Sequence, residues 1–379
     1  MRHLFNIVQG ATVVLAFALR PWGTPPPAAG RIERVGSLGT ARAVHTATAL
    51  PAGRLLVTGG MGSGGASLAS AEIVDMSGAR ASRDGRSAFQ VEALPPMAHA
   101  RVGHTAVPLP DGRVVLAGGY DGGYLSSVEV FDPARKRFQP LGELREGRSG
   151  HTATLLRDGR ILIVGGVGRG WTFLSSAEVL DPRSGRSEPV GAMSVARESH
   201  TATLLPDGRV LIVGDHRGRR EAMEVHASAE IYDPAARRFH PAGRLGTPRH
   251  KHDAVLLANG GVLVLGGADR TDRRYFATTE VYDPAAGVFK AGPSMASTRY
   301  KFQGTAIRLP TGDLLVPSGA RQAEVLDRRS FTFRPVPGEL PAAYAFSTAT
   351  RLSTGDVAIV GGYDSRNQNT AGVWLFRER

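Results

Sequence analysis

Side chains able to bind a metal or transfer protons gather in one stretch of the sequence. Asp215 and His216 are adjacent, Glu224 and His226 follow in the same predicted loop, and residues 249–253 read Arg-His-Lys-His-Asp. Carboxylates and imidazoles bind divalent transition metals, and imidazole also exchanges protons near neutral pH. The spacing matches no established ligand motif and the neighbouring cations oppose a bound cation, so we expect no metal and no cofactor. A role as acid and base stays open.

A second group of histidines recurs at regular intervals. A ring of imidazoles at the mouth of a central channel could bind a metal or shuttle protons. Packing explains a recurring residue better, because a catalytic site is usually asymmetric. We therefore interpret these histidines as structural, and retain His200 and His252 as candidate ligand contacts. The five are His45, His104, His151, His200 and His252.

These histidines mark a repeat that predicts the architecture. A glycine stands fourteen residues after each of them, as from His45 to Gly59, and it begins a double glycine in every one of these copies but the fourth, where Asp215 follows Gly214. Two degenerate copies follow, which we align as Gly304 to Ser318 and Ser347 to Gly361. A period of 43 to 59 residues is typical of a propeller or another array, whose units bury their apolar faces only against neighbours.

Each copy reads as four antiparallel strands. In the copy that starts at Arg197, residues 200–205 and 210–213 form two strands joined by an Asp-Gly turn. A third strand at 228–234 ends in Asp-Pro, which favours a type I turn, and a fourth begins near Phe239.

The double glycine and the third strand, Thr-Glu-Val-Tyr-Asp-Pro at 279–284, resemble the kelch repeat over residues 31–376. The resemblance implies an all-β, seven-bladed β-propeller of kelch type spanning residues 31–379. Residues 32–38 match a fourth strand, whereas the last copy stops after a third strand at 373–376. We therefore predict that the N-terminal strand closes the last blade and protects the sheet edge.

Arginine and glutamate recur in five copies and predict an ion pair inside each blade. The Arg stands three residues before the repeated His and the Glu lies in the third strand, with the glycine end of the second strand between them. An Arg side chain could cross the glycine backbone to reach the Glu. The expected pairs are Arg42 and Glu72, Arg101 and Glu129, Arg148 and Glu178, Arg197 and Glu230, and Arg249 and Glu280.

The sixth and seventh copies depart from this pattern. In the seventh copy we align Tyr344 with the Arg and Gly372 with the Glu, while the sixth has Glu324 and an Arg299 that is displaced by two residues.

Variation concentrates in the loops between second and third strands, which share one face with the loops that enter the first strands. Arginine forks pair with carboxylates, and aromatic faces stack on sugars. We therefore expect these loops to bind an anionic or sugar-like ligand. The alternative interpretation is that their side chains only form the solvated rim of an Arg-rich protein. The candidate contacts are Tyr124, Arg169, Trp171, His200, His216, His226, His252, Arg270, Arg273 and Tyr363.

The N-terminus predicts export. Residues 1–18 read as a signal peptide that ends in a small-x-small cleavage pattern, and residues 19–30 form a Pro-rich linker. An uncleaved anchor is the alternative, and no other segment is expected to span a membrane. We expect a secreted or periplasmic monomer. The absence of cysteine excludes disulfides and thiolate sites. The net charge of +12 comes from 4 Lys and 42 Arg spread along the chain, which does not indicate nucleic-acid binding.

Two function classes fit the sequence. The repeat resembles that of galactose oxidase, but copper-radical chemistry of that kind needs a Tyr–Cys cross-link, which a cysteine-free chain excludes. It also resembles the periplasmic sialic-acid mutarotases, without a residue motif that carries their activity over. We expect a binding module that presents its loops to a protein or glycan ligand. The alternative is an isomerase or lyase that acts on an acidic carbohydrate.

Overall fold

The computed structural model describes residues 30–78 and 88–378. The predicted signal peptide and all of the linker except Gly30 lie outside these residues. The described residues form strands and three short 3-10 helices, η1 (Ser63–Gly65), η2 (Arg169–Trp171) and η3 (Arg220–Ala222). No helix within the described ranges is long and apolar enough to cross a membrane.

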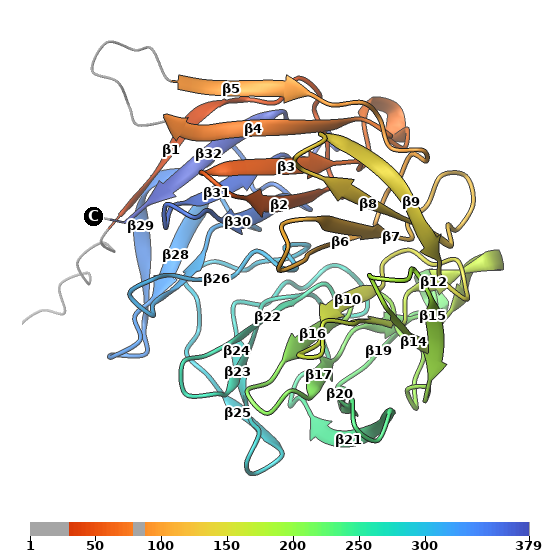
Figure 1. Cartoon of the computed structure of the whole chain (residues 1–379). Coiled ribbons are helices and arrows are strands. Elements are labelled where there is room, and N and C mark those ends of the chain that lie inside the picture. Colours follow the sequence, from red (N-terminus) through yellow and green to blue (C-terminus); the bar gives the residue numbers. More distant parts are fainter. Residues whose placement is uncertain (1–29, 79–87, 379) are drawn as a thin grey trace, which may run out of the picture.

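Seven four-stranded antiparallel sheets surround a central channel, which confirms the predicted seven-bladed propeller (Figure 1). Blade 1 contains β2 (Thr46–Leu50), β3 (Arg54–Thr58), β4 (Ala71–Gly78) and β5 (Ala88–Ala93). Blade 2 contains β6 (Thr105–Pro108), β7 (Val114–Ala117), β8 (Ser127–Asp132) and β9 (Arg137–Glu143). Blade 3 contains β10 (Thr152–Leu155), β11 (Ile161–Val164), β14 (Ala177–Leu180) and β15 (Ser187–Val190). Blade 4 contains β16 (Thr201–Leu204), β17 (Val210–Val213), β20 (Ser228–Asp233) and β21 (Arg238–Arg244). Blade 5 contains β22 (Asp253–Leu256), β23 (Val262–Leu265), β24 (Thr279–Asp283) and β25 (Val288–Ala291).

Blades 6 and 7 complete the ring. Blade 6 contains β26 (Ile307–Arg308), β27 (Leu314–Val316), β28 (Gln322–Leu326) and β29 (Phe333–Glu339). Blade 7 contains β30 (Thr348–Arg351), β31 (Val357–Val360), β32 (Gly372–Arg377) and β1 (Arg31–Ser37). Two short hairpins project from the loops of blades 3 and 4: β12 (Val167–Gly168) with β13 (Thr172–Phe173), and β18 (His216–Arg217) with β19 (Glu224–Val225).

The core lies between blades. Successive side chains of a strand point to opposite faces, so each second strand packs against both neighbouring blades. In β17, Leu211 packs in a cluster with Val264 of blade 5, whereas Ile212 packs in a cluster with Leu162 of blade 3. Both faces of the second strands are therefore apolar, as the continuous apolar runs predict.

The N-terminal strand closes the ring, as predicted. β1 pairs antiparallel with β32, with Ile32 opposite Phe376 and Gly36 opposite Val373. Ile32 and Leu38 are buried in the apolar clusters on the two sides of blade 7. The first and last described segments are thus held in one sheet.

The predicted arginine–glutamate partners lie together within each blade. Arginine Nη2 is 2.7–3.1 Å from glutamate Oε1 in all five pairs, and the arginine side chains are at most 1% exposed. Each arginine also donates to the carbonyl of the first glycine, as from Arg197 Nη1 to Gly214 O at 3.0 Å.

Blades 6 and 7 correct the sequence alignment. Arg299 is not displaced, since its Nη2 lies 2.9 Å from Glu324 Oε1 and makes a sixth buried pair. Phe302, rather than Gly304, therefore occupies the histidine position. In blade 7 the residue in register with the glutamates is Trp374, not Gly372, because Ile359 pairs with Trp374 as Ile163 pairs with Glu178. Tyr344 and Trp374 contact each other, with ring centroids 5.4 Å apart, and replace the ion pair.

The repeated histidines link neighbouring blades. Nε2 of each lies within 3.2 Å of a threonine Oγ1 on the first strand of the preceding blade, as for His200 and Thr152 at 2.9 Å. Each ring also covers the first glycine of that blade: a Cβ on Gly165 would lie 2.8 Å from His200 Cε1. The crossing arginine is therefore not the only reason for the double glycine, because the histidine of the neighbouring blade also requires the first glycine.

Where the histidine is absent, its partners change too. Blade 6 has Phe302, which cannot hydrogen-bond, and blade 5 has Asp253 in place of the threonine. The Asp253 carboxylate accepts the N–H groups of Gly304, Thr305 and Ala306 at 2.8–2.9 Å. At the junction of blades 6 and 7, Ser347 Oγ donates to Ser318 Oγ at 3.0 Å, so each blade junction keeps a polar link across it.

We expect the buried ion pairs to be strongly coupled in stability. Arg197→Ala or Glu230→Ala should each lower the free energy of unfolding by about 3–5 kcal/mol, because the remaining charge is buried without its partner. The double variant should lose less than the sum of the two single losses. Urea unfolding of the four proteins measures the coupling, and strictly additive losses would contradict it.

Candidate functional site

Two sets of loops meet on one face of the disc, which we call the loop face. Isolated bridges join the loop that enters the first strand to the loop after the second strand, as between Glu198 and His216 or between Ala345 and Tyr363. Side chains from neighbouring blades therefore converge around the channel mouth. The channel itself is a cavity of about 380 Å³.

A ring of backbone hydrogen bonds encircles the channel and is interrupted once. At six of the seven blade junctions, the residue before the histidine position donates its N–H to the same position of the adjacent blade, as from Ser199 N to Gly150 O at 3.0 Å. At the junction of blades 4 and 5, the Lys251 N–H instead donates to Asp215 Oδ2 at 3.1 Å. The asymmetry seen in the sequence of the fourth copy is thus a break in the symmetry of the ring.

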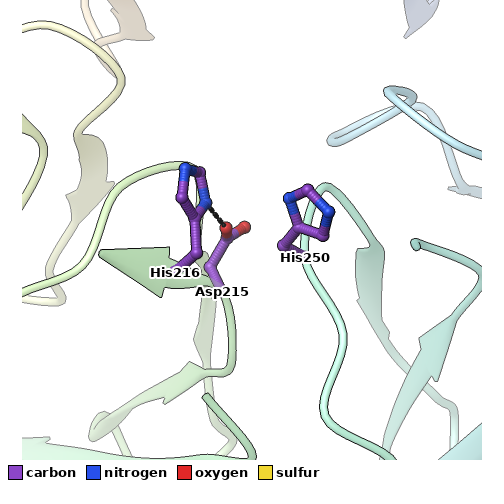
Figure 2. Close-up of side chains that lie close together, drawn as sticks. All are labelled: Asp215, His216 and His250. Atoms are coloured by element: carbon purple, nitrogen blue, oxygen red, sulfur yellow. Dashed lines mark hydrogen bonds and ion pairs between the residues drawn. The ribbon is translucent and has the colours of Figure 1, made fainter. Parts of the chain in front are cut away.

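Asp215 lies between two histidines at this break (Figure 2). Its Oδ1 is 2.6 Å from His216 Nδ1, and the His216 and His250 rings are 5.2 Å apart. All three side chains are at most 1% exposed. Burial raises the pKa of Asp215 to about 8 and lowers that of His216 to about 4, so both groups favour their neutral forms at pH 7.

A second group, which we call the lysine–tyrosine group, adjoins this cluster and consists of Lys251, Asp272, Tyr300, Lys301 and Tyr363. Tyr300 donates to Asp272 Oδ1 at 2.5 Å, and Lys251 Nζ donates to Tyr300 Oη at 3.0 Å. Lys301 Nζ donates to Tyr363 Oη at 2.9 Å. Burial lowers the pKa of both lysines, and burial together with the Asp272 hydrogen bond raises the pKa of Tyr300.

His250 connects the two groups. Its Nε2 is 2.9 Å from the Asp269 carbonyl and 3.0 Å from Asp272 Oδ1. Burial raises the pKa of Asp272, but hydrogen bonds from His250 and Tyr300 outweigh it and hold this pKa below its usual value. A continuous set of titratable groups therefore runs from the Asp215 cluster to the lysine–tyrosine group.

The loop face has a cleft beside blade 6. Only residues 317–321 separate β27 from β28, whereas residues 266–278 separate the equivalent strands of blade 5. The short loop leaves a cleft of about 510 Å³ that is open to the lysine–tyrosine group. Its walls include Tyr275, Tyr300, Lys301, Arg321, Tyr363 and Asp364.

The predicted contact residues fall into separate places. Tyr124 and Trp171 pack together with ring centroids 6.0 Å apart, and Arg219 covers the Trp171 ring. His226 and Arg270 line a different pocket of about 710 Å³ between blades 4 and 5.

The remaining predicted contacts do not gather at one site. Arg169 and Arg273 are exposed on their loops, and Tyr363 lies in the cleft. His200 and His252 are buried between blades, and burial lowers the pKa of each to about 3. Of the fourth-copy residues, His216 joins Asp215 and His250, while Glu224 pairs with Arg217 at 2.7 Å.

Comparison with known proteins supports the repeat assignment. The family model described as Kelch motif matches residues 101–145 and 148–194, which are the arginine-to-fourth-strand segments of blades 2 and 3. The chain is a kelch-repeat β-propeller. A search of curated protein sequences gave no significant match.

A solved structure is similar to this chain in fold over most of its length. It is a fungal alcohol oxidase of the AA5 family in complex with copper, with a TM-score of 0.71 and 17% identity, covering 92% of this chain and 76% of that one. At this identity the likeness concerns the fold.

Apart from Tyr363, the residues of the lysine–tyrosine group were not among the contacts predicted from the sequence. The chain has only 4 lysines against 42 arginines, and two of the lysines stand at equivalent places, in Arg249-His-Lys251 and Arg299-Tyr-Lys301. Aligning the sixth copy on Gly304 hid this equivalence. Aligning it on Phe302 would have revealed it.

Proposed function

We propose that this kelch propeller is a binding module that holds an anionic ligand, an acidic glycan, in the cleft beside blade 6. The observation that carries the proposal is the Lys301 ammonium. It lies 5.0–5.7 Å from the ring centroids of Tyr300, Phe346 and Tyr363, and no carboxylate of the described residues lies within ion-pair distance of it. A half-buried cation without a carboxylate partner favours an anion from outside.

The cleft walls suit a sugar ring. Tyr275 and Tyr300 stack with centroids 4.8 Å apart, and Tyr275 is 45% exposed. Aromatic faces bind the apolar faces of sugars. Arg321 at the rim pairs with the exposed Glu339 at 3.0 Å, and a ligand carboxylate would compete with Glu339 for its forked donor. The predicted signal peptide supports a secreted or periplasmic site of action, where such glycans are accessible.

We expect Lys301→Met to weaken the binding of acidic oligosaccharides at least about tenfold, because it removes the charge while keeping the aliphatic stem. Calorimetric titration with uronic-acid and sialic-acid saccharides, and with neutral sugars of the same size, measures the effect. Lys290→Met is the matched control, because Lys290 is exposed and pairs with Asp283 in a distant turn. Equal affinities of the two variants, or no preference for acidic sugars, would contradict the proposal.

The hydrogen-bonded Lys251, Tyr300 and Asp272 favour a second candidate function, an isomerase or lyase acting on an acidic carbohydrate. Such enzymes need a base beside a group that neutralises the carboxylate. NMR of the same saccharides during incubation distinguishes the two functions, since catalysis creates new resonances and binding only broadens or shifts existing ones.

A further inference from the structure

The residues at the junction of blades 4 and 5 are not required by the propeller. Asp215 occupies the place of the second glycine, which is glycine in the other six blades, and its φ of 76° lies in the left-handed region. That conformation costs a non-glycine residue about 1 kcal/mol or more. At the place of His216, blades 1 and 3 have Met61 and Val167, and at the place of His250, blade 1 has Ala43. Ring closure is therefore compatible with apolar residues at two of these positions and glycine at the third.

The three side chains present ligand atoms to a common point. One ligand atom from each of Asp215, His216 and His250 lies within 4.8 Å of the others. Figure 2 shows the His250 ring edge turned towards the Asp215 carboxylate, with the His216 ring on the other side. The set is fully buried, and it combines two imidazoles with one carboxylate, which suits first-row divalent transition metals.

Two ring nitrogens of this set lack hydrogen-bond partners within the described residues. They are His216 Nε2 and His250 Nδ1, and both are buried. His216 Nε2 lies 3.6 Å from Glu198 Oε2, and the nitrogen that faces Asp215 is His216 Nδ1. His250 Nε2 is held by the Asp269 carbonyl and Asp272, which fixes the proton on Nε2 and leaves the Nδ1 lone pair facing Asp215. Orientation of a ligating histidine by a carboxylate and a carbonyl is the usual supporting arrangement in metal sites.

The neighbouring cations, which argued against a metal at the sequence level, are already paired. Lys251 Nζ lies 3.8 Å from Asp272 Oδ2, and Arg219 lies 3.0 Å from Glu198. Arg197 and Arg249 are held by the glutamates of their own blades. The charge of a bound metal therefore meets no unpaired cation among the groups that surround Asp215.

We propose that Asp215, His216 and His250 form a binding site for one divalent first-row transition metal of the zinc class. Ligand atoms bonded to such a metal at about 2.0–2.2 Å are separated by roughly 3.3–3.6 Å in a tetrahedral site. Binding therefore parts Asp215 from His216, releases the shared proton and draws His250 inwards. Water or a ligand from the loop face completes the coordination. This site is independent of the glycan proposal, which rests on Lys301.

Metal titration of the chelator-stripped full chain, free of any affinity tag, tests the site. We expect one Zn²⁺ per chain by calorimetry, and one Co²⁺ with visible d–d absorption typical of a nitrogen- and oxygen-ligated ion. Asp215→Gly, His216→Val and His250→Ala each introduce a residue that another blade has at that position, so the fold should be kept. Each variant should bind at least about tenfold more weakly than the wild type.

His226→Ala is the matched control. His226 is a neighbouring half-buried histidine whose Nε2 also lacks a partner in the described chain, yet it lies outside the cluster. It should bind Zn²⁺ like the wild type. No stoichiometric binding at micromolar Zn²⁺ and Co²⁺, or a loss in His226→Ala equal to that in the cluster variants, would overturn the proposal.

Discussion

Lowering the pH from 7.5 to 5.5 should reduce the free energy of unfolding by about 7 kcal/mol through the five histidines that join the blades. Burial lowers the pKa of His45, His104, His200 and His252 to about 3, and that of His151 well below its usual value. The unfolded chain takes up protons near pH 6.5 and the folded protein does not. The stabilisation is therefore complete above pH 6.5 and is lost as the pH falls towards 3.

Other buried groups nearly cancel in this range. The raised pKa of Asp215 acts in the opposite direction, because the folded protein then binds a proton that the unfolded chain releases. His216 and His226, with pKa values lowered to about 4, lose stability as the pH falls and so cancel the gain from Asp215. Asp253, whose pKa burial raises to about 6, offsets only about 1 kcal/mol of the histidine effect. The net effect should therefore follow the five inter-blade histidines.

Urea unfolding at several pH values measures this dependence. His104→Gln should reduce the pH-dependent loss by about one fifth, because one titrating group is removed while an amide can still bond to Thr46. The same variant should leave ligand binding intact, since the ring lies between blades rather than on the loop face. A stability that stays constant between pH 7.5 and 5.5 would contradict this prediction, because it would show that these histidines take up protons in the folded protein as readily as in the unfolded chain.

A chain that begins at residue 41 should melt roughly 10 °C or more below one that begins at residue 30. The shorter chain lacks β1, exposes the edge of β32, and opens the apolar clusters that bury Ile32 and Leu38. It also loses the Gly39 N–H that donates to Glu72 Oε2 at 2.8 Å in the adjacent blade 1. The truncation therefore opens the ring, in addition to removing one strand pair.

Calorimetry of the two chains measures the difference. Adding a peptide of residues 30–40 in excess should restore much of the lost stability, because the open edge pairs with any strand of the right sequence. Identical melting curves for the two chains would contradict the role of β1.

Much of the fold follows from the sequence because each blade repeats the same local pattern. The Asp-Gly turns, the apolar second strands and the fixed histidine-to-glycine spacing specify one unit, and seven copies of it specify a ring. The arginine–glutamate pairing also follows, since both partners lie in one blade and the glycine between them leaves room. Alignment failed where the pattern is degenerate: Phe302 replaces a histidine, and Trp374 replaces a glutamate together with Tyr344.

The candidate site depended on packing between blades, which no repeat pattern encodes. Asp215 and His250 belong to different blades, and they meet because the backbone ring opens between Ser199 and Lys251. Lys301 and Tyr363 meet across blades 6 and 7 because the loop of blade 6 is short. The sequence determined by itself the repeated unit and the closure of the ring. Only the tertiary structure decided which side chains converge, because convergence depends on inter-blade contacts that differ at each junction.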